Sequence, residues 1–333
     1  MSAVNFHKVA IVGAGAIGGW MGVHLARAGA QVSVLARGDT LQALQKNGLQ
    51  MHQGSELLTV PVVASQDAAA LGVQDLVVIS VKAPALASVA AQVGPLIGPN
   101  TVVLTAMNGV PWWFLQGFGG PVEGRSLSSV DPSGAIAQAL PAAHIIGCVV
   151  HASCSVDAPG VIRHHFGDGL IVGEPSGQPT ARVQALHALL QQAGFNATLS
   201  PQIQKDIWYK LWGNMTVNPV SAITGATTDR ILDDELVRGF ISNVMLEAKT
   251  IGERIGIPIA QAPEDRHAVT RKLGAFKTSM LQDVQAGKPV ELDALVSAVR
   301  ELGQLTQVAT PFTDALLGLS RLHARGLGLY PAQ

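Results

Sequence analysis

The chain has 333 residues, enough for two domains of ordinary size, and only 14% of them are charged, against about 25% in an average soluble protein. Its net charge is −1 without a basic block, which excludes the electrostatics of a nucleic-acid-binding protein. The two cysteines, Cys148 and Cys154, lack a CxxC spacing and indicate a reducing compartment. We therefore expect a cytoplasmic protein without nucleic-acid or membrane partners.

The first predicted elements are a buried strand at 8–12, a helix at 16–27 ending before Gly29, and a second strand at 31–36. Between the first two stands a G-x-G-x-x-G motif. Its first glycine permits a sharp turn, its second allows a pyrophosphate to approach the backbone, and its third allows close helix–strand packing. We predict a dinucleotide site at Gly13, Ala14, Gly15, Ala16, Ile17 and Gly18.

The same apolar run, residues 9–26, could also be interpreted as a signal-peptide core or a membrane span. Five glycines and His24 interrupt it, and the spacing of the glycines favours the dinucleotide interpretation.

The end of the second strand discriminates between cofactors. An acidic residue there would bind the 2′-hydroxyl of NAD, whereas the sequence reads Ala36-Arg37-Gly38. Arginine suits a 2′-phosphate, so we expect NADPH/NADP as the cofactor. Because the acidic Asp39 is nearby, NAD remains an alternative cofactor. Arg37 could also be a charged side chain of a solvated loop.

Two further buried strands, at 75–83 and 101–109, carry polar side chains at their carboxyl ends. These are Lys82 and Asn108, and ligands of open α/β sheets gather at such ends. Taken alone, each has an ordinary structural alternative, a snorkelling lysine and a turn asparagine.

Residues 110–135 form an irregular insertion that contains Trp112 and Trp113. It could be a lid, a partner surface or a long loop, and we expect the tryptophans to shape access to the site. Strands at 144–156 and 160–174, a helix at 179–193 and a strand at 195–199 follow. The nearby histidines lack metal-ligand spacing, so we expect no metal at His151, His164 or His165.

After Pro201 the pattern is helical throughout. The sequence therefore predicts an α/β fold with a Rossmann-type NADP-binding domain at 1–200 and an all-helical domain at 201–333. The helices are expected at 201–217, 230–255, 263–286, 291–306 and 311–325.

A polar stripe crosses the first of these helices, in "KLWGNMTVNP". Lys210, Asn214 and Asn218 are four residues apart, so each lies only about 40° round the helix from the last. The stripe is expected to end at Pro219, and the neighbouring residues are apolar.

A second polar segment is "KTSMLQDVQAGKPVELD", residues 277–293. Ser279 falls in a predicted helix, and Glu291 follows Pro289 at the head of the next one. Alone, the serine would be bonded to its own backbone and the glutamate would interact with the helix dipole.

Together, "GAGAIGG", "SVK", "MNG", "WYKLWGNMTVNP" and "TSMLQDVQAGKPVELD" resemble the ketopantoate reductase (2-dehydropantoate 2-reductase) family over essentially the whole chain. The resemblance implies NADPH-dependent reduction of a 2-keto acid in a cleft between two domains. It implies a catalytic lysine at Lys210 and a second essential polar residue at Glu291. It further implies cofactor contacts at Arg37, Lys82 and Asn108, and substrate contacts at Asn108, Asn214, Asn218, Ser279 and Glu291.

The residue types fit this chemistry, because a lysine can polarise a ketone oxygen and deliver a proton to it. The expected reaction is 2-dehydropantoate to pantoate, a step of pantothenate biosynthesis. Two alternative functions remain. One is a 2-hydroxyacid or opine-type dehydrogenase that acts on another substrate, and the other is a non-catalytic NADP-binding regulator. The sequence does not determine which 2-keto acid is the substrate. It also does not determine the oligomeric state, for which a homodimer is one possibility.

Overall fold

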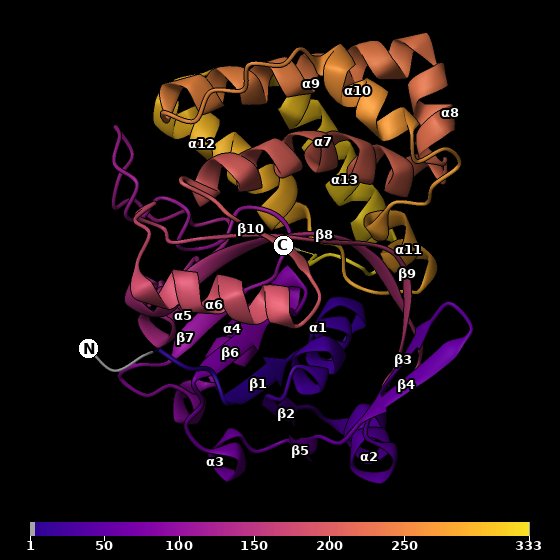
Figure 1. Cartoon of the computed structure of the whole chain (residues 1–333). Coiled ribbons are helices and arrows are strands. Elements are labelled where there is room, and N and C mark those ends of the chain that lie inside the picture. Colours follow the sequence, from indigo (N-terminus) through magenta and orange to yellow (C-terminus); the bar gives the residue numbers. More distant parts are fainter. Residues whose placement is uncertain (1–3, 333) are drawn as a thin grey trace. The chain divides into compact units, whose positions relative to one another are not determined.

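A computed structural model describes residues 4–332, which divide into two compact units (Figure 1). The first contains the described residues up to Met107 together with Gln116–Phe118 and Ser133–Ile203. The second contains Asn108–Leu115, Gly119–Pro132 and the described residues from Gln204 onward. The predicted division at residue 200 is therefore wrong for most of the insertion, which groups with the helical unit.

The first unit is built on a ten-stranded sheet within the described residues. The strand order is β4-β3-β9-β8-β7-β6-β1-β2-β5, and β10 pairs with β9. The strands are β1 (Lys8–Val12), β2 (Gln31–Leu35), β3 (Leu49–Gln53), β4 (Glu56–Val60), β5 (Val63–Ser65), β6 (Leu76–Ile79), β7 (Val102–Thr105), β8 (Ile145–Ala158), β9 (Val161–Gly173) and β10 (Asn196–Leu199).

The half of the sheet from β5 to β8 is wholly parallel, in the order β5-β2-β1-β6-β7-β8. The chain builds outward from β1 to β2 and β5, then returns to the other side of β1 for β6, β7 and β8. This reversal is the doubly wound arrangement, in which ligands bind beyond the carboxyl ends of the strands at the switch point. It confirms the predicted Rossmann-type fold and places the switch between β1 and β6.

The other half of the sheet has mixed directions. Strands β8 and β9, which were both predicted as strands, form a long antiparallel pair. Strand β3 pairs parallel to β9, β4 pairs antiparallel to β3, and β10 pairs parallel to β9. The sequence analysis named no element in the stretch that forms β3, β4 and β5, where short strands are separated by only a few residues.

Short helices complete the first unit. The α-helices are α1 (Ala16–Arg27), α2 (Gly38–Asn47), α3 (Ala68–Leu71), α4 (Leu86–Ala90), α5 (Ala135–Ala139) and α6 (Ala181–Gln192). The 3₁₀ helices are η1 (Ala83–Ala85), η2 (Gly94–Leu96) and η3 (Ala142–His144).

Helix α1 packs closely on the sheet through glycines. A Cβ atom at Gly19 would lie 2.4 Å from Ile162 Cγ1, and one at Gly22 would lie 2.9 Å from Leu49 Cδ2. Trp20 and Met21, between them, are fully buried. The apolar run at 9–26 therefore forms most of β1, the glycine loop and most of α1, and this placement in the sheet and its packed helix favours the dinucleotide interpretation over a signal peptide or a membrane span.

The second unit is helical, as predicted, but two of the predicted helices are interrupted. Its elements are α7 (Ile203–Thr224), α8 (Thr228–Asp233), α9 (Glu235–Arg254), α10 (Pro263–Arg271), α11 (Ser279–Gln285), the π-helix η4 (Asp293–Ser297), α12 (Ala298–Thr306) and α13 (Pro311–Gly326). The run at 230–255 breaks between α8 and α9, where Asp234 caps α9 by accepting hydrogen bonds from Leu236 N and Val237 N. The run at 263–286 breaks at Gly274, whose φ is +63°.

Helix α7 continues beyond Pro219, so the predicted end of the helix before that residue is wrong. A proline inside a helix removes one hydrogen bond and costs about 3 kcal/mol. The turns on both sides are buried, with Val217 and Val220 each 6% exposed. Burial of these apolar side chains offsets that cost.

The insertion is packed into the second unit. Trp112 is 5% exposed and Trp113 is 1% exposed, and the Phe114 ring lies 6.0 Å from that of Trp208 on α7. Glu301 on α12 accepts hydrogen bonds from Ser128 N (2.8 Å), Ser128 Oγ (2.9 Å) and Ser129 N (2.8 Å). The tryptophans are therefore core residues of the second unit, and this burial favours a packing role over the expected role in shaping access to the site.

None of the helices in residues 4–332 combines the length and the apolar character that crossing a membrane requires.

Candidate active site

The glycine loop of the first unit lies at the switch point, between the carboxyl ends of β1 and β6. Gly13 has φ +97°, in the left-handed region that favours glycine, and Ser80 Oγ donates a hydrogen bond to its carbonyl oxygen at 2.8 Å. A Cβ atom at Gly18 would lie 2.1 Å from that same oxygen. Gly13 and Gly18 are thus required by the packing of the loop itself.

Gly15 differs from Gly13 and Gly18, because the packing of the loop does not require a glycine there. It is the N-cap residue of α1, and a Cβ atom added to it would meet no described atom within 4 Å. The first turn of α1, within the described chain, contains no acidic residue. Because the N-cap residue is a glycine, no side chain caps the first N–H groups of the helix. The N-terminus of α1 therefore presents free backbone donors and open space, the cradle that a pyrophosphate needs.

The cofactor-specificity segment follows β2. Arg37 is the N-cap residue of α2 and is exposed, and Gly38 after it has φ +57°. Asp39 lies in the first turn of α2 and is also exposed. The guanidinium can reach an anion from solvent, and the residues present fit a 2′-phosphorylated dinucleotide.

Lys82 and Asn108 follow two neighbouring parallel strands. Lys82 is exposed and caps η1, three residues after the end of β6, in the first unit. Asn108 is half-buried and belongs to the second unit, three residues after the end of β7. The predicted strands at 75–83 and 101–109 are thus shorter than expected, ending at Ile79 and Thr105.

The second unit brings the lysine of the polar stripe onto Asn108. Lys210 Nζ donates a hydrogen bond to Asn108 Oδ1 at 2.8 Å. Both side chains are half-buried, and Asn214 and Asn218 follow along the same face of α7, with Asn218 7% exposed. A carboxamide oxygen accepts this hydrogen bond and orients the Lys210 amine without adding charge.

The faces of α7 next to the stripe are fixed by close packing. Trp212 Nε1 donates to the carbonyl of Met245 on α9 at 2.7 Å. A Cβ atom at Gly213 would lie 2.7 Å from Arg266 Nε, and the guanidinium of Arg266 lies 5.4 Å from the centre of the Tyr209 ring. Burial lowers the pKa of Arg266. These contacts hold the turn of the helix that carries Lys210 and Asn214.

Ser279 and Glu291 occupy the two ends of the polar segment 277–293. Ser279 is the first residue of α11, where Thr278 caps the helix by accepting a hydrogen bond from Leu281 N. Glu291 precedes η4 and is 5% exposed. A carboxyl group this buried is rare unless it serves a partner or a ligand.

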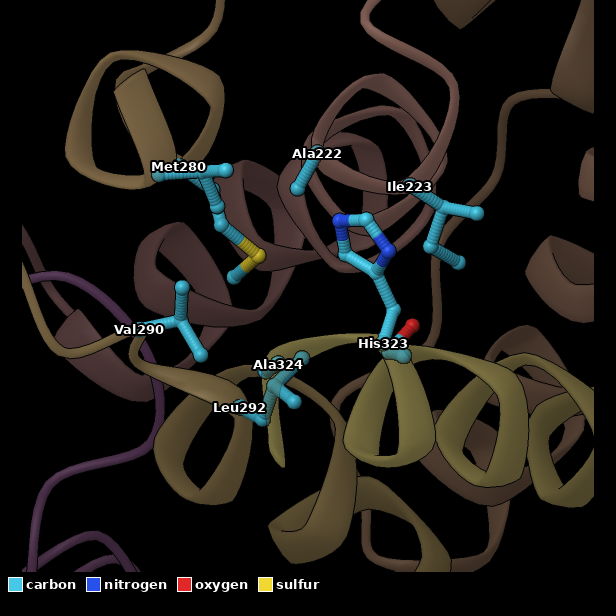
Figure 2. A pocket seen from close by; sticks show the side chains of 9 residues that line it. Ala222, Ile223, Met280, Val290, Leu292, His323 and Ala324 are labelled. Atoms are coloured by element: carbon cyan, nitrogen blue, oxygen red, sulfur yellow. The ribbon is translucent and has the colours of Figure 1, made fainter. Parts of the chain in front are cut away.

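A small apolar pocket supports both ends of this segment (Figure 2). Met280, next to Ser279, lines it, as do Val290 and Leu292, which flank Glu291. The imidazole of His323 on α13 points into the pocket. The polar residues of the segment therefore alternate with apolar ones that are anchored in the helical unit.

The structure adds residues that the sequence analysis did not single out. Gly109 and Ala294 lie in close contact beside Asn108, and Arg266 packs on α7. Their only sequence signals are a glycine after an asparagine and an arginine with no obvious partner, and both are common in unrelated proteins.

The histidines of β8 and β9 make local contacts. His164 Nε2 is 2.7 Å from the carbonyl oxygen of Gly167, and His165 Nε2 is 2.9 Å from Ser155 Oγ. Across residues 4–332, no group of three or more His, Cys, Asp or Glu side chains could hold a metal ion.

The doubly wound sheet, the glycine loop and the lysine-bearing helical unit define a dinucleotide-dependent α/β protein. Two family profiles match the chain: "Ketopantoate reductase PanE/ApbA" over residues 9–113 and its "C terminal" profile over residues 202–324. The chain belongs to the ketopantoate reductase family, whose members are oxidoreductases that act on CH–OH groups and use NADP.

Similar proteins extend over nearly the whole chain. A 2-dehydropantoate 2-reductase of Mesorhizobium japonicum is 46% identical over 97% of this chain and 99% of its own length. The crystal structure of a candidate ketopantoate reductase from Ralstonia solanacearum MolK2 is 57% identical, covers 98% of this chain and 100% of its own, and superimposes with a TM-score of 0.95. A PanE/ApbA family ketopantoate reductase from Ralstonia eutropha JMP134 is 27% identical, with a TM-score of 0.82 over 96% of this chain and 99% of its own.

Proposed function

We propose that this chain catalyses the NADPH-dependent reduction of 2-dehydropantoate (ketopantoate) to pantoate. The observation that carries the proposal is the hydrogen bond from Lys210 Nζ to Asn108 Oδ1 at 2.8 Å, in a chain whose other unit carries a dinucleotide loop. The name and 46% identity of the Mesorhizobium japonicum relative support the choice of substrate.

In this proposal the first unit holds the cofactor. Bound NADPH supplies the hydride that adds to the ketone carbon. Residues 13–18 receive the pyrophosphate at the N-terminus of α1, and Arg37 pairs with the 2′-phosphate. Lys82, exposed at the carboxyl end of β6, adds a positive charge toward the phosphates.

The second unit supplies the proton. As hydride reaches the carbonyl carbon, negative charge develops on the carbonyl oxygen, and Lys210 stabilises that charge and donates a proton to it. Asn108 orients the ammonium by accepting one of its hydrogen bonds. Asn108 also contacts the nicotinamide end of the cofactor in this proposal, as the family resemblance implies.

The remaining polar residues bind the substrate. Ser279 and Asn214 donate hydrogen bonds to its carboxylate, and Asn218 extends the same polar face. Glu291 accepts a hydrogen bond from the substrate hydroxyl, a group that ketopantoate has and simpler 2-keto acids lack. The carboxylate of Glu291 therefore selects for a hydroxylated 2-keto acid.

The experiment is NADPH oxidation by the purified protein with ketopantoate, compared with a panel of 2-keto acids that lack its hydroxyl. We expect the highest kcat/KM for ketopantoate. In Glu291→Gln, the ratio of kcat/KM for ketopantoate to kcat/KM for the other 2-keto acids should fall. Turnover only in the presence of an added amine would assign an opine-type activity instead. Binding of NADPH without turnover of any keto acid would assign a regulator.

The proposed location is the cytoplasm, and the proposed assembly is a homodimer. The chain has only two cysteines, Cys148 and Cys154, and this low number suits a reducing compartment. On α13, Leu319 is 60% exposed and Leu322 is 71% exposed, which offers apolar surface to a second copy of the chain. Sedimentation of wild type and Leu322→Glu decides the assembly: a dimer that the variant abolishes supports it, and a monomeric wild type excludes it.

A further inference from the structure

A short π-helix, η4 (Asp293–Ser297), begins two residues after Glu291. The N–H of Ala298 donates to the carbonyl of Asp293, five residues back, where an α-helix would use a residue four back. Such bulges are rare and occur mostly as single turns inside α-helices, frequently at functional sites.

One side of η4 holds the turn that carries Asn108. The N–H of Val110 donates to the carbonyl oxygen of Ala294 at 2.8 Å. Gly109 has φ +85°, and a Cβ atom there would lie 2.7 Å from both the Cβ and the carbonyl oxygen of Ala294. The turn thus touches η4 backbone to backbone, and the next residue toward the N-terminus is Asn108, the acceptor for Lys210.

The other side of η4 is tied to the C-terminal segment. Tyr330 OH donates to Asp293 Oδ1 at 2.6 Å, and Ser297 Oγ donates to the same oxygen at 2.9 Å. Val290 N donates to the carbonyl of Leu329 at 3.1 Å. Burial raises the pKa of Tyr330 to about 12, so its hydroxyl stays a donor at neutral pH. Glu291 therefore lies between two residues that bond to the C-terminal segment, Val290 through its backbone N–H and Asp293 through its carboxylate.

We propose that Gly109, Ala294 and Tyr330 are positioning residues for the reduction: η4 sets the place of Asn108, and through it the Lys210 ammonium, while the tie to the C-terminal segment sets the place of Glu291. The inference rests on the proposed function, since it takes Lys210 and Glu291 as the residues that act on the substrate. None of the three positioning residues needs to touch the substrate.

The structure explains why a small change at η4 should affect turnover. Asn108 and Glu291 sit on separate segments, and η4 is the element that both adjoin. A displacement of about 1 Å in a reacting group can cost about 100-fold in rate. A change at Gly109 should therefore lower kcat more than it alters binding of the cofactor, whose loop lies in the other unit.

The first test compares Gly109→Ala with Gly119→Ala. Both glycines have positive φ and lie in the second unit, but a Cβ atom at Gly119 meets no described atom within 4 Å. We expect kcat to fall about 10–100-fold in Gly109→Ala, and to stay within about twofold of wild type in Gly119→Ala. The NADPH dissociation constant should be unchanged in both. The alkaline limb of the kcat profile should move to lower pH in Gly109→Ala, because Asn108 no longer stabilises the ammonium.

The second test compares Tyr330→Phe with Ser297→Ala. Both substitutions only remove a hydroxyl group, so neither adds an atom to the protein core. Both variants remove one donor to Asp293 Oδ1, but only Tyr330→Phe removes a hydrogen bond between η4 and the C-terminal segment. We expect kcat/KM for ketopantoate to fall about fivefold in Tyr330→Phe, the effect of one lost hydrogen bond, and less in Ser297→Ala.

The outcomes separate this inference from the proposed function. A wild-type protein that reduces no 2-keto acid would overturn the proposed function. With an active wild type, equal kcat values and pH profiles in Gly109→Ala and Gly119→Ala would overturn the role of the Gly109–Ala294 contact. Should Gly109→Ala fail to fold, Tyr330→Phe decides: equal kcat/KM in Tyr330→Phe and Ser297→Ala overturns the proposal, and the expected difference supports it.

Discussion

The dinucleotide loop of the first unit and the lysine site of the second are assembled in opposite ways. The loop is nearly continuous in sequence, and residues 13–18 are closed by the segment after β6, where Ser80 Oγ donates to the Gly13 carbonyl. In the proposed lysine site, Asn108, Lys210, Ser279 and Glu291 come from four separate segments of the sequence. The first depends on backbone groups and missing side chains, whereas the second depends on side chains at defined places.

In the proposed function, this difference reflects what each unit recognises. A pyrophosphate is bound by N–H groups that every residue carries, so glycine spacing is enough to specify its site. A proton donor must meet one oxygen atom, so it needs a specific side chain and supports that fix its orientation. The two regions should therefore respond differently to substitution, and the predictions below test that contrast.

The largest effect is expected at Lys210. Lys210→Ala should lower kcat about 10²–10⁴-fold, the usual contribution of a positioned acid. Lys210→Arg should not restore the rate, because a guanidinium does not readily give up a proton. Steady-state kinetics with ketopantoate measure both variants, with the NADPH dissociation constant as the control. A nearly full rate in Lys210→Arg would leave this residue only an electrostatic role.

Trp113 should affect stability alone. It is 1% exposed, so Trp113→Ala should cost about 3–5 kcal/mol of unfolding free energy. Leu236→Ala, at a side chain that is 79% exposed, is the matched control and should change stability little. Denaturant unfolding measures both, and the ranking of 2-keto acid substrates should stay the same. A changed ranking would show that the insertion takes part in substrate selection after all.

Arg37 should discriminate between cofactors. Arg37→Ala removes a charge-assisted contact worth about 1.5–3 kcal/mol, so NADPH should bind about 10–150-fold more weakly while NADH binding is unchanged. Arg27→Ala, an exposed arginine at the end of α1, is the control. Fluorescence titration with each cofactor gives the dissociation constants. Equal losses for both cofactors would mean that Arg37 does not bind the 2′-phosphate.

Substitutions at Gly15 and Gly18 should have different effects, the first on ligand binding and the second on the stability of the protein. Gly15→Ala should keep the melting temperature of wild type and weaken NADPH binding about tenfold, or about 1.4 kcal/mol. Gly18→Ala should lower the melting temperature even without ligand, because its Cβ would lie 2.1 Å from the Gly13 carbonyl oxygen. Thermal unfolding with and without NADPH distinguishes the two. Loss of stability in Gly15→Ala without ligand would contradict the open cradle.

The fold was largely predictable where the signal is local. Strand β1 and helix α1 match the predicted ranges because apolar runs and glycine spacing act over a few residues. Predicted ends failed where tertiary packing outweighs local preference. Pro219 stays inside α7 because its neighbours are buried, and Trp112 and Trp113 are core residues because the insertion packs on α7.

The candidate site was predictable in its residue types and not in its supports. The spacing of Lys210, Asn214 and Asn218 gave a common helix face, and a resemblance joined them to Asn108 and Glu291. No periodicity links Gly109 to Ala294, since that contact depends on a π-helix between distant segments. Contacts of this kind follow from the tertiary structure alone.

The most direct test of the division between the two units is a double-mutant cycle of Arg37→Ala and Lys210→Ala, measured as kcat/KM for NADPH. If the first unit binds the cofactor and the second supplies the proton, the two losses should add to within about 0.5 kcal/mol. A coupling of about 1 kcal/mol or more would contradict the account, because it would show that the two residues act on a shared step.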